Sequence, residues 1–155
     1  MKILKPVFLF LLLVSGFNLF AQQGKVLEEQ NLKSKILKRN VNYAVYLPPD
    51  YETANRTYPV VYLLHGYTDD HTGWLQFGEV NRYADKAISD GTIPPMIIVM
   101  PNADSSWYIN SYDSKEKYED FFIKEFMPHI EKALRIKAEK NTGALQGFRW
   151  AVTEH

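Results

Sequence analysis

The sequence predicts an α/β fold with a mainly parallel sheet, and three features of one stretch support this prediction. Residues 60–64 and 96–100 are short, continuous apolar runs, as in strands that are buried on both faces of a sheet. Between them, apolar residues recur at helical spacing, at Tyr83, Ala84, Ala87 and Ile88. A strand, a helix and a second buried strand in this order are typical of a parallel crossover in an α/β sheet.

Composition limits the chain to one ordinary core. It has 155 residues, of which 46% are hydrophobic, too few for two domains. Lys plus Arg number 18 and Asp plus Glu also number 18, and no basic stripe is present, so a nucleic acid partner is not expected. Cysteine is absent, which excludes disulfides and a thiolate nucleophile. The four histidines show no metal-ligand spacing, so no metal and no cofactor are expected.

The first 21 residues predict a secretory signal peptide. Lys2 and Lys5 precede an apolar run over residues 7–14, and Ala21 occupies the expected cleavage position. The apolar run is short for a membrane span, although a retained anchor is the competing interpretation. We therefore expect a secreted or periplasmic product with no stable membrane anchor after cleavage.

Two alternating segments predict an antiparallel hairpin at the start of the mature chain. They are Lys33–Arg39 and Val41–Leu47, with a turn at Arg39-Asn40. Pro48-Pro49 ends the second strand, because proline cannot donate to a strand ladder.

Two helical features are expected after the second buried strand. Asp113 and Glu116 have the spacing of a capping box, which predicts a helix start there. The following apolar residues lie four apart and are expected in the core: Tyr118, Phe122, Phe126, Ile130 and Leu134. Pro128 interrupts this pattern, so a kink or a helix restart is expected at that residue.

A site is expected where the first apolar run ends at His65-Gly66. In α/β sheets, ligands bind at the loops past the carboxyl ends of the strands. Glycine there lets backbone N–H groups approach a substrate closely. The alternative is that His65 only packs and Gly66 only turns the chain.

The ordered motifs of the chain resemble those of a known family. They are Tyr46–Tyr51, Tyr58–Gly66, Trp74 and Ile97–Asn102. Over residues 33–140 they resemble the putative esterase family of α/β hydrolases, which includes feruloyl and acetylxylan esterases, S-formylglutathione hydrolases and mycolyltransferases. The resemblance implies an α/β-hydrolase fold, truncated after the first half of the central sheet, with residues 22–140 as the N-terminal half of an esterase domain.

The resemblance also implies roles for individual residues. The backbone N–H of Tyr67 would belong to the oxyanion hole. His65, Gly66, Trp74 and Asn102 would bind or line the pocket for the ester substrate. The nucleophile of the family is a serine in a G-x-S-M-G-G turn, followed later by an acid and a histidine, and residues 143–155 contain no such turn. Ser105 and Ser106 lie in an ordinary loop and are not expected to replace it.

The genetic code offers an explanation for the missing turn. When the degenerate codons of residues 146–155 are read one nucleotide earlier, they permit Gly-Phe-Ser-Met-Gly-Gly-Tyr-Gly-Ala, provided that Arg149 has a CGN codon. Residues 141–155 are therefore interpreted as an out-of-frame tail.

Three functional hypotheses follow. The first is a secreted serine carboxylesterase that acts on a small-molecule or polysaccharide ester and is inactive in this form. The second is a non-catalytic module that binds a polysaccharide ester or another acyl group. The third is a non-functional fragment, because in the family a fifth strand covers the edge of the strand at residues 59–64, and its loss exposes an aggregation-prone edge.

Overall fold

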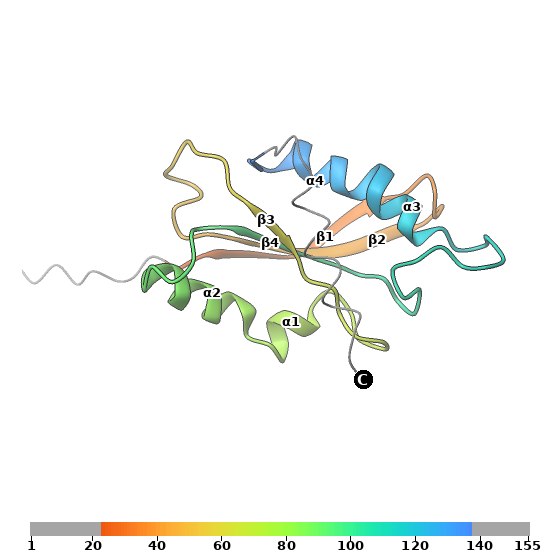
Figure 1. Ribbon diagram of the computed structural model, residues 1–155, viewed down its shortest axis with the longest axis horizontal. Helices are drawn as coiled ribbons and strands as arrows, with labels where there is room; N and C mark the ends of the chain where they lie inside the picture. Colours follow the sequence, from red (N-terminus) through yellow and green to blue (C-terminus); the bar gives the residue numbers. More distant parts are fainter. Residues whose placement is uncertain (1–22, 138–155) are drawn as a thin grey trace, which may run out of the picture.

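The computed structural model describes residues 23–137, which form a mixed sheet with helices on both faces (Figure 1). This architecture confirms the α/β class expected from the sequence. The predicted signal peptide and the predicted tail from residue 141 lie outside the described residues. Within residues 23–137, no helix is long and apolar enough to span a membrane.

The sheet has four strands in the order β1-β2-β4-β3. β1 (Lys25–Lys33) and β2 (Asn40–Leu47) form an antiparallel hairpin, and β4 (Ile97–Pro101) pairs antiparallel with β2. β3 (Val60–Tyr62) pairs parallel with β4. Because parallel neighbours end at the same edge of a sheet, the loops that follow β3 and β4 lie close together.

Helices cover both faces of the sheet, which explains the continuous apolar runs. Val45 and Val99 belong to one core cluster, together with the aromatic residues of the helices at 118–133. Tyr46 and Ile98 belong to a second cluster, beneath α2 (Val80–Ser89). All residues of β4, and residues 43–47 of β2, are therefore buried whichever way their side chains point.

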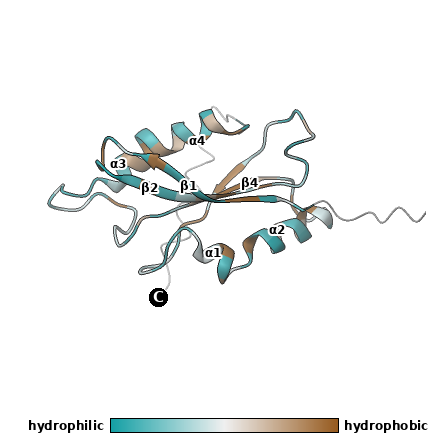
Figure 2. Ribbon diagram, turned by 180° about the vertical axis from the view of Figure 1, so that it is seen from behind, coloured by the Kyte–Doolittle hydropathy of each residue, from teal (hydrophilic) through white to brown (hydrophobic). Residues whose placement is uncertain are grey.

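The predicted helix after the first apolar run is α2, which follows the short α1 (Gly73–Gln76). Figure 2 shows hydrophilic and hydrophobic residues mixed along α2, as expected of a helix with one face on a sheet. Gly91 follows it with a φ of 70°, a left-handed conformation that glycine adopts without strain. The helix thus ends at Ser89, directly before Asp90 and Gly91.

The last helical segment changes its winding before Pro128. It consists of α3 (Tyr118–Phe121), the π-helix η1 (Phe122–Phe126) and α4 (Met127–Ala133), in which Pro128 is the second residue. The backbone is helical on both sides of this change, and the Met127 N–H donates to the Phe122 carbonyl oxygen in the i→i−5 pattern of a π-helix. The helix therefore changes its winding next to Pro128 rather than restarting there. The predicted core residues Tyr118, Phe122, Phe126 and Ile130 are buried, whereas Leu134 is partly buried.

The predicted capping box at Asp113 and Glu116 is wrong, because the helix begins at Tyr118. The Asp113 carboxylate instead accepts hydrogen bonds from the Ser111 hydroxyl and the Lys115 N–H, at 2.8 and 3.2 Å. Glu116 forms an ion pair with Arg39. These contacts stabilise a turn before the helix.

The predicted strand at Lys33–Arg39 is also wrong, since residues 34–39 form the loop between β1 and β2. The Ser34 hydroxyl accepts a hydrogen bond from the Leu37 N–H at 2.8 Å and donates to Glu125 of the π-helix at 2.6 Å. Lys38 has a φ of 57°, which strand residues do not adopt. The true partner strand β1 lies earlier, and an irregularity in register between Leu27 and Gln30 disrupts its alternation.

β3 is shorter than predicted and lies at the edge of the described sheet. It ends at Tyr62, although the Leu63 N–H still donates to the Val99 carbonyl at 2.9 Å. Val61 is 37% exposed, whereas every residue of β4 is buried. Beside Tyr58, residues 135–137 return to this edge in parallel, since the Tyr58 N–H donates to the Arg135 carbonyl and the Lys137 N–H donates to the Tyr58 carbonyl, both at 2.8 Å.

Substituting Val61→Lys should increase the monomeric fraction of the purified chain, because a charge on an exposed strand edge opposes pairing with a second molecule. Size-exclusion chromatography with light scattering measures this fraction. Ile123→Lys is the matched control, since Ile123 is also an exposed apolar residue, at 47%, but lies on the π-helix. Equal effects of the two substitutions would contradict the role of the edge.

Candidate functional site

The candidate site consists of the two loops past the carboxyl ends of β3 and β4. The β3 loop comprises residues 63–72, and the β4 loop comprises residues 102–117. The parallel register, with Tyr62 opposite Val99, brings both loops to one edge of the sheet. The sequence predicted a site at this edge.

The His65 ring fastens the two loops together. Its Nε2 accepts a hydrogen bond from the Ala103 N–H at 2.9 Å, and its Nδ1 lies 2.8 Å from the Gly66 carbonyl oxygen. These partners assign the neutral tautomer with the proton on Nδ1. His65 is 6% exposed, so its ring is committed to positioning the loops.

Tyr108 holds the backbone of His65 from the other side. Its hydroxyl accepts a hydrogen bond from the His65 N–H at 2.7 Å and donates to the His65 carbonyl oxygen at 3.1 Å. Burial raises the pKa of the Tyr108 hydroxyl above its usual value, so the donating proton stays in place. One side chain thus satisfies both backbone groups of the residue that precedes Gly66.

Gly66 and Tyr67 form the exposed part of the β3 loop. A Cβ atom built on Gly66 would meet no atom within 4 Å, so the space beside this backbone is open. Tyr67 is 56% exposed, and its ring stacks on Trp107 with centroids 5.0 Å apart and an interplanar angle of 15°. The Tyr67 N–H donates to no described residue.

Several residues of these loops adopt left-handed backbone conformations without being glycine. Thr68 has a φ of 71°, Trp107 of 56° and Tyr108 of 61°. Such conformations cost on the order of 1–3 kcal/mol each and persist only where surrounding contacts enforce them. The hydrogen bonds of Tyr108 and the ring stack of Trp107 provide such contacts.

The other predicted site residues hold the edges of the loops. The Trp74 indole N–H donates to the Leu64 carbonyl oxygen at 3.0 Å, while the residue remains 39% exposed. The Asn102 side chain binds the N–H and the carboxylate of Asp104, each at 3.1 Å. Trp74 therefore braces the end of β3, and Asn102 braces the start of the β4 loop.

Asp70 stabilises the far end of the β3 loop. Its Oδ1 accepts hydrogen bonds from the hydroxyl and the N–H of Thr72, both at 2.7 Å. These bonds, led by the hydroxyl, hold the pKa of the Asp70 carboxyl below its usual value. The carboxylate is thus committed to the turn that leads into α1.

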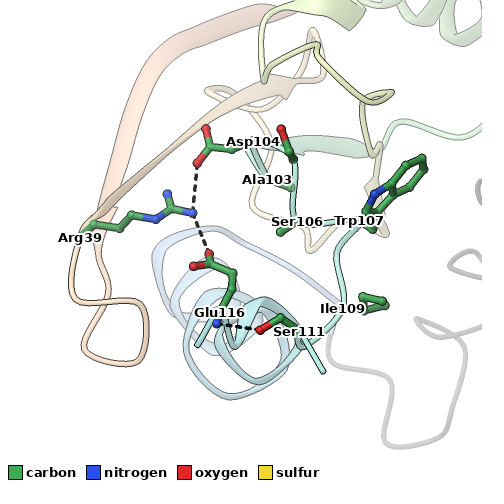
Figure 3. A pocket seen from close by; sticks show the side chains of 9 residues that line it. Arg39, Ala103, Asp104, Ser106, Trp107, Ile109, Ser111 and Glu116 are labelled. Carbon is green, nitrogen blue, oxygen red and sulfur yellow. Dashed lines mark hydrogen bonds and ion pairs between the residues drawn. The ribbon is translucent and has the colours of Figure 1, made fainter. Parts of the chain in front are cut away.

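An open cavity of about 440 Å³ lies beside the β4 loop (Figure 3). On one side, Arg39 reaches Asp104 and Glu116, with both N···O distances 3.1 Å. Trp107 and Ile109 lie on the opposite side. The remaining lining residues are small: Ala103, Ser105, Ser106 and Ser111.

The described residues contain no serine paired with a histidine base. The His65 ring is bonded to the Ala103 N–H and the Gly66 carbonyl oxygen, and His129 bonds to the Tyr43 hydroxyl at 3.0 Å. His71 is buried, and neither of its ring nitrogens has a hydrogen-bond partner among the described residues. The Ser106 hydroxyl accepts a weak hydrogen bond from the Tyr108 N–H at 3.3 Å. Within residues 23–137, no group of three metal-ligating side chains occurs.

Tyr108 and Arg39 are site residues that sequence analysis missed. Tyr108 lies in a polar loop with no periodicity, and the sequence places Arg39 in a hairpin turn. Their partners are distant in the chain, since Arg39 and Glu116 are separated by 77 positions. A local pattern therefore carries no signal for either residue.

Comparisons with known proteins agree with the motifs. A family model described as "Putative esterase" matches residues 34–148. An esterase of Mycobacterium tuberculosis is 36% identical over 113 residues, which cover 70% of this chain and 24% of that protein. A protein named endo-1,4-beta-xylanase/feruloyl esterase from Xylanibacter ruminicola is 34% identical over 111 residues, or 67% of this chain and 15% of that protein.

A solved structure described as a ferulic acid esterase is similar in three dimensions. It has a TM-score of 0.70 and 36% identity, and the match covers 76% of this chain and 46% of that one. The chain therefore spans less than half of that structure and about a quarter or less of the two relatives.

Tyr108→Phe should lower the free energy of unfolding by about 1–3 kcal/mol, because the buried N–H and carbonyl of His65 lose their shared partner. Urea unfolding followed by circular dichroism measures the change. Tyr83→Phe is the control, since Tyr83 is 65% exposed, and it should leave stability unchanged. Equal stability of Tyr108→Phe and wild type would show that the hydroxyl does not hold the loop.

Proposed function

Because the chain belongs to the putative esterase family and has the α/β-hydrolase fold, we propose that it represents the N-terminal half of a secreted serine carboxylesterase. Such an enzyme hydrolyses carboxylic esters. The proposal covers the whole enzyme, of which this chain supplies the first strands of the sheet and part of the site.

The observation that carries the proposal is the backbone N–H of Tyr67, which follows the end of β3 and donates to no residue that the structure describes. Backbone N–H groups that point at a fixed, open position stabilise the negative charge that develops on the oxygen of an ester carbonyl during attack. The donor must already be in place when the charge develops, and His65 and Tyr108 hold the preceding backbone through four hydrogen bonds. Open space beside Gly66 gives the substrate access.

Hydrolysis also needs a nucleophile, a base and an acid. We assign the nucleophile to a serine in a G-x-S-M-G-G turn, which the codons of residues 146–155 permit one nucleotide out of frame. The acid and the base would follow in the same restored frame. Residues 143–155 contain no such turn, and no described serine is paired with a histidine base, so we expect the 155-residue chain to be inactive.

The proposed substrate is a small-molecule or polysaccharide ester. Two similar proteins carry the names feruloyl esterase and ferulic acid esterase, which supports an aromatic acyl group. The other half of one name, endo-1,4-beta-xylanase, supports a polysaccharide alcohol. An extracellular or periplasmic location, as the predicted signal peptide implies, suits such a substrate.

A non-catalytic binding role is the second candidate, and the cavity beside the β4 loop favours it. The described residues that line this cavity lie between positions 39 and 116, and binding there does not require a nucleophile. Saturable binding without turnover would distinguish this role from catalysis.

The purified 155-residue chain should hydrolyse p-nitrophenyl acetate no faster than buffer, because no described serine has a histidine base. Release of p-nitrophenolate measures the rate. Ser105→Ala and Ser106→Ala serve as matched controls and should change nothing. Turnover that either substitution abolished would contradict the assignment of the nucleophile.

Resequencing the gene from the Lys140 codon onward tests the rest of the proposal. One added nucleotide should restore G-x-S-M-G-G and open a frame that encodes an acid and a histidine, and the product of that frame should hydrolyse the same ester. A confirmed frame without such a continuation would exclude the serine-hydrolase mechanism for this protein.

A further inference from the structure

We propose that His71 is a positioning residue of the β3 loop, and that its ring forms a hydrogen bond to the half of the enzyme beyond residue 137. This bond holds the loop that carries Tyr67 against the half that carries the nucleophile. The inference rests on the proposed function, because it requires that second half. It adds a residue that acts through the loop and touches neither the substrate nor the reacting atoms.

The His71 ring is buried and has no hydrogen-bond partner in the part of the chain that the structure describes. The residue is 6% exposed, and both of its ring nitrogens, Nδ1 and Nε2, are enclosed. A neutral imidazole has one N–H donor and one acceptor nitrogen, and leaving either unpaired in a protein interior is unfavourable. Buried polar side-chain atoms in native proteins are for the most part hydrogen-bonded. The ring therefore indicates a partner outside residues 23–137.

The missing partner is particular to His71 and is not a general feature of the β3 loop. His65 is equally buried, at 6% exposure, and both of its ring nitrogens have partners among the described residues. Asp70, the neighbour of His71 in the chain, accepts two hydrogen bonds from Thr72. The loop thus satisfies its other buried or committed side chains by itself.

A hydrogen-bonded turn keeps His71 in its buried position, without help from any bond of the ring. Asp70 accepts the Thr72 N–H at its side chain and the Gly73 N–H at its carbonyl oxygen, the latter at 3.3 Å. The backbone at Gly73 passes so close to the Asp69 carboxylate that an added Cβ atom would overlap it. The turn therefore presents the ring at a fixed place, as a docking contact requires.

This turn is the second of two supports for the segment that carries Tyr67. The first support is His65, whose ring bonds to the β4 loop within the described chain. The Asp69 N–H donates to the Gly66 carbonyl oxygen at 3.2 Å and so joins the two supports across Tyr67. A shift of the turn at His71 therefore also shifts the Tyr67 N–H, the proposed oxyanion donor.

The course of the chain after α4 identifies the second half as the source of the partner. Ile136 pairs in parallel with Tyr58, on the side of β3 that β4 does not occupy. In the proposed enzyme, a chain that continued this parallel pairing would reach the end of β3 and the loop beyond it. The other end of the described chain leads into β1, at the opposite edge of the sheet.

Thermal unfolding of two proteins tests the bond: the 155-residue chain and the product of the restored frame. His71→Phe replaces the ring by an apolar ring. In the 155-residue chain it should leave the unfolding midpoint unchanged or raise it by roughly 2–4 °C, because no described partner is lost. In the restored-frame enzyme it should lower the midpoint by roughly 2–4 °C, because the partner in the second half loses its hydrogen bond.

His65→Phe is the matched control, since His65 is as buried as His71 but has its partners within residues 23–137. It should lower the unfolding midpoint of both proteins. Equal effects of His71→Phe in the two proteins would overturn the inference, as would be seen if a buried water alone served the ring.

Hydrolysis of p-nitrophenyl acetate by the restored-frame enzyme separates positioning from a merely structural role. His71→Phe should lower kcat by about 10- to 100-fold and leave KM unchanged, because a displaced donor weakens binding of the transition state more than that of the substrate. Either His71→Gln or His71→Asn, whose amide donates and accepts near one ring nitrogen, should recover most of kcat. Equal losses in all three variants, or an unchanged kcat in His71→Phe, would overturn the inference.

The two measurements distinguish this inference from the proposed function. Opposite effects of His71→Phe on the stability of the two proteins, together with an inactive restored-frame enzyme, would support the bond and overturn the esterase. Normal hydrolysis, together with no effect of His71→Phe on stability or kcat, would overturn the bond and support the esterase.

Discussion

The Tyr108 hydroxyl, which bonds to both the N–H and the carbonyl of His65, is the contact on which the geometry of the site depends. The end of a strand leaves its backbone groups without ladder partners, and a buried unpaired group costs about 1–3 kcal/mol. Tyr108 removes this cost, and the His65 ring in turn accepts a hydrogen bond from the Ala103 N–H in the β4 loop. Hydrogen bonds thus join the two loops on both sides of His65, while the Tyr67 N–H donates to no residue within 23–137.

Local periodicity predicted the parts of the fold that depend on neighbouring residues. The runs at 60–64 and 96–100 became β3 and β4, and the aromatic stripe from Tyr118 is buried, because burial on a fixed face leaves a repeating pattern. The prediction of a strand at Lys33–Arg39 was wrong, because this segment forms a loop that is held by a hydrogen bond between Ser34 and Glu125, 91 positions apart. Likewise, the position of the site could be predicted from the ends of the strands. Tyr108 and Arg39 could not be predicted, because their partners are distant in the sequence.

The same sheet combines one fully protected strand with one exposed one. β4 contacts both core clusters and has strands on both sides, so each of its side chains and backbone groups is enclosed. β3 has a strand on one side within residues 23–137, although Tyr58 already pairs with the segment after α4. The described residues thus build a stable floor for the site and leave the opposite edge of that floor open to further strand pairing.

The Glu125 carboxylate links the β1–β2 loop to the π-helix, where it accepts hydrogen bonds from the Ser34 hydroxyl and the Lys35 N–H. A hairpin usually forms early because its contacts are local. Here the hydrogen bonds to Glu125 cannot form until a segment about ninety residues later has been synthesised. The turn of the N-terminal hairpin therefore shares its stability with η1, the helix that supplies this carboxylate.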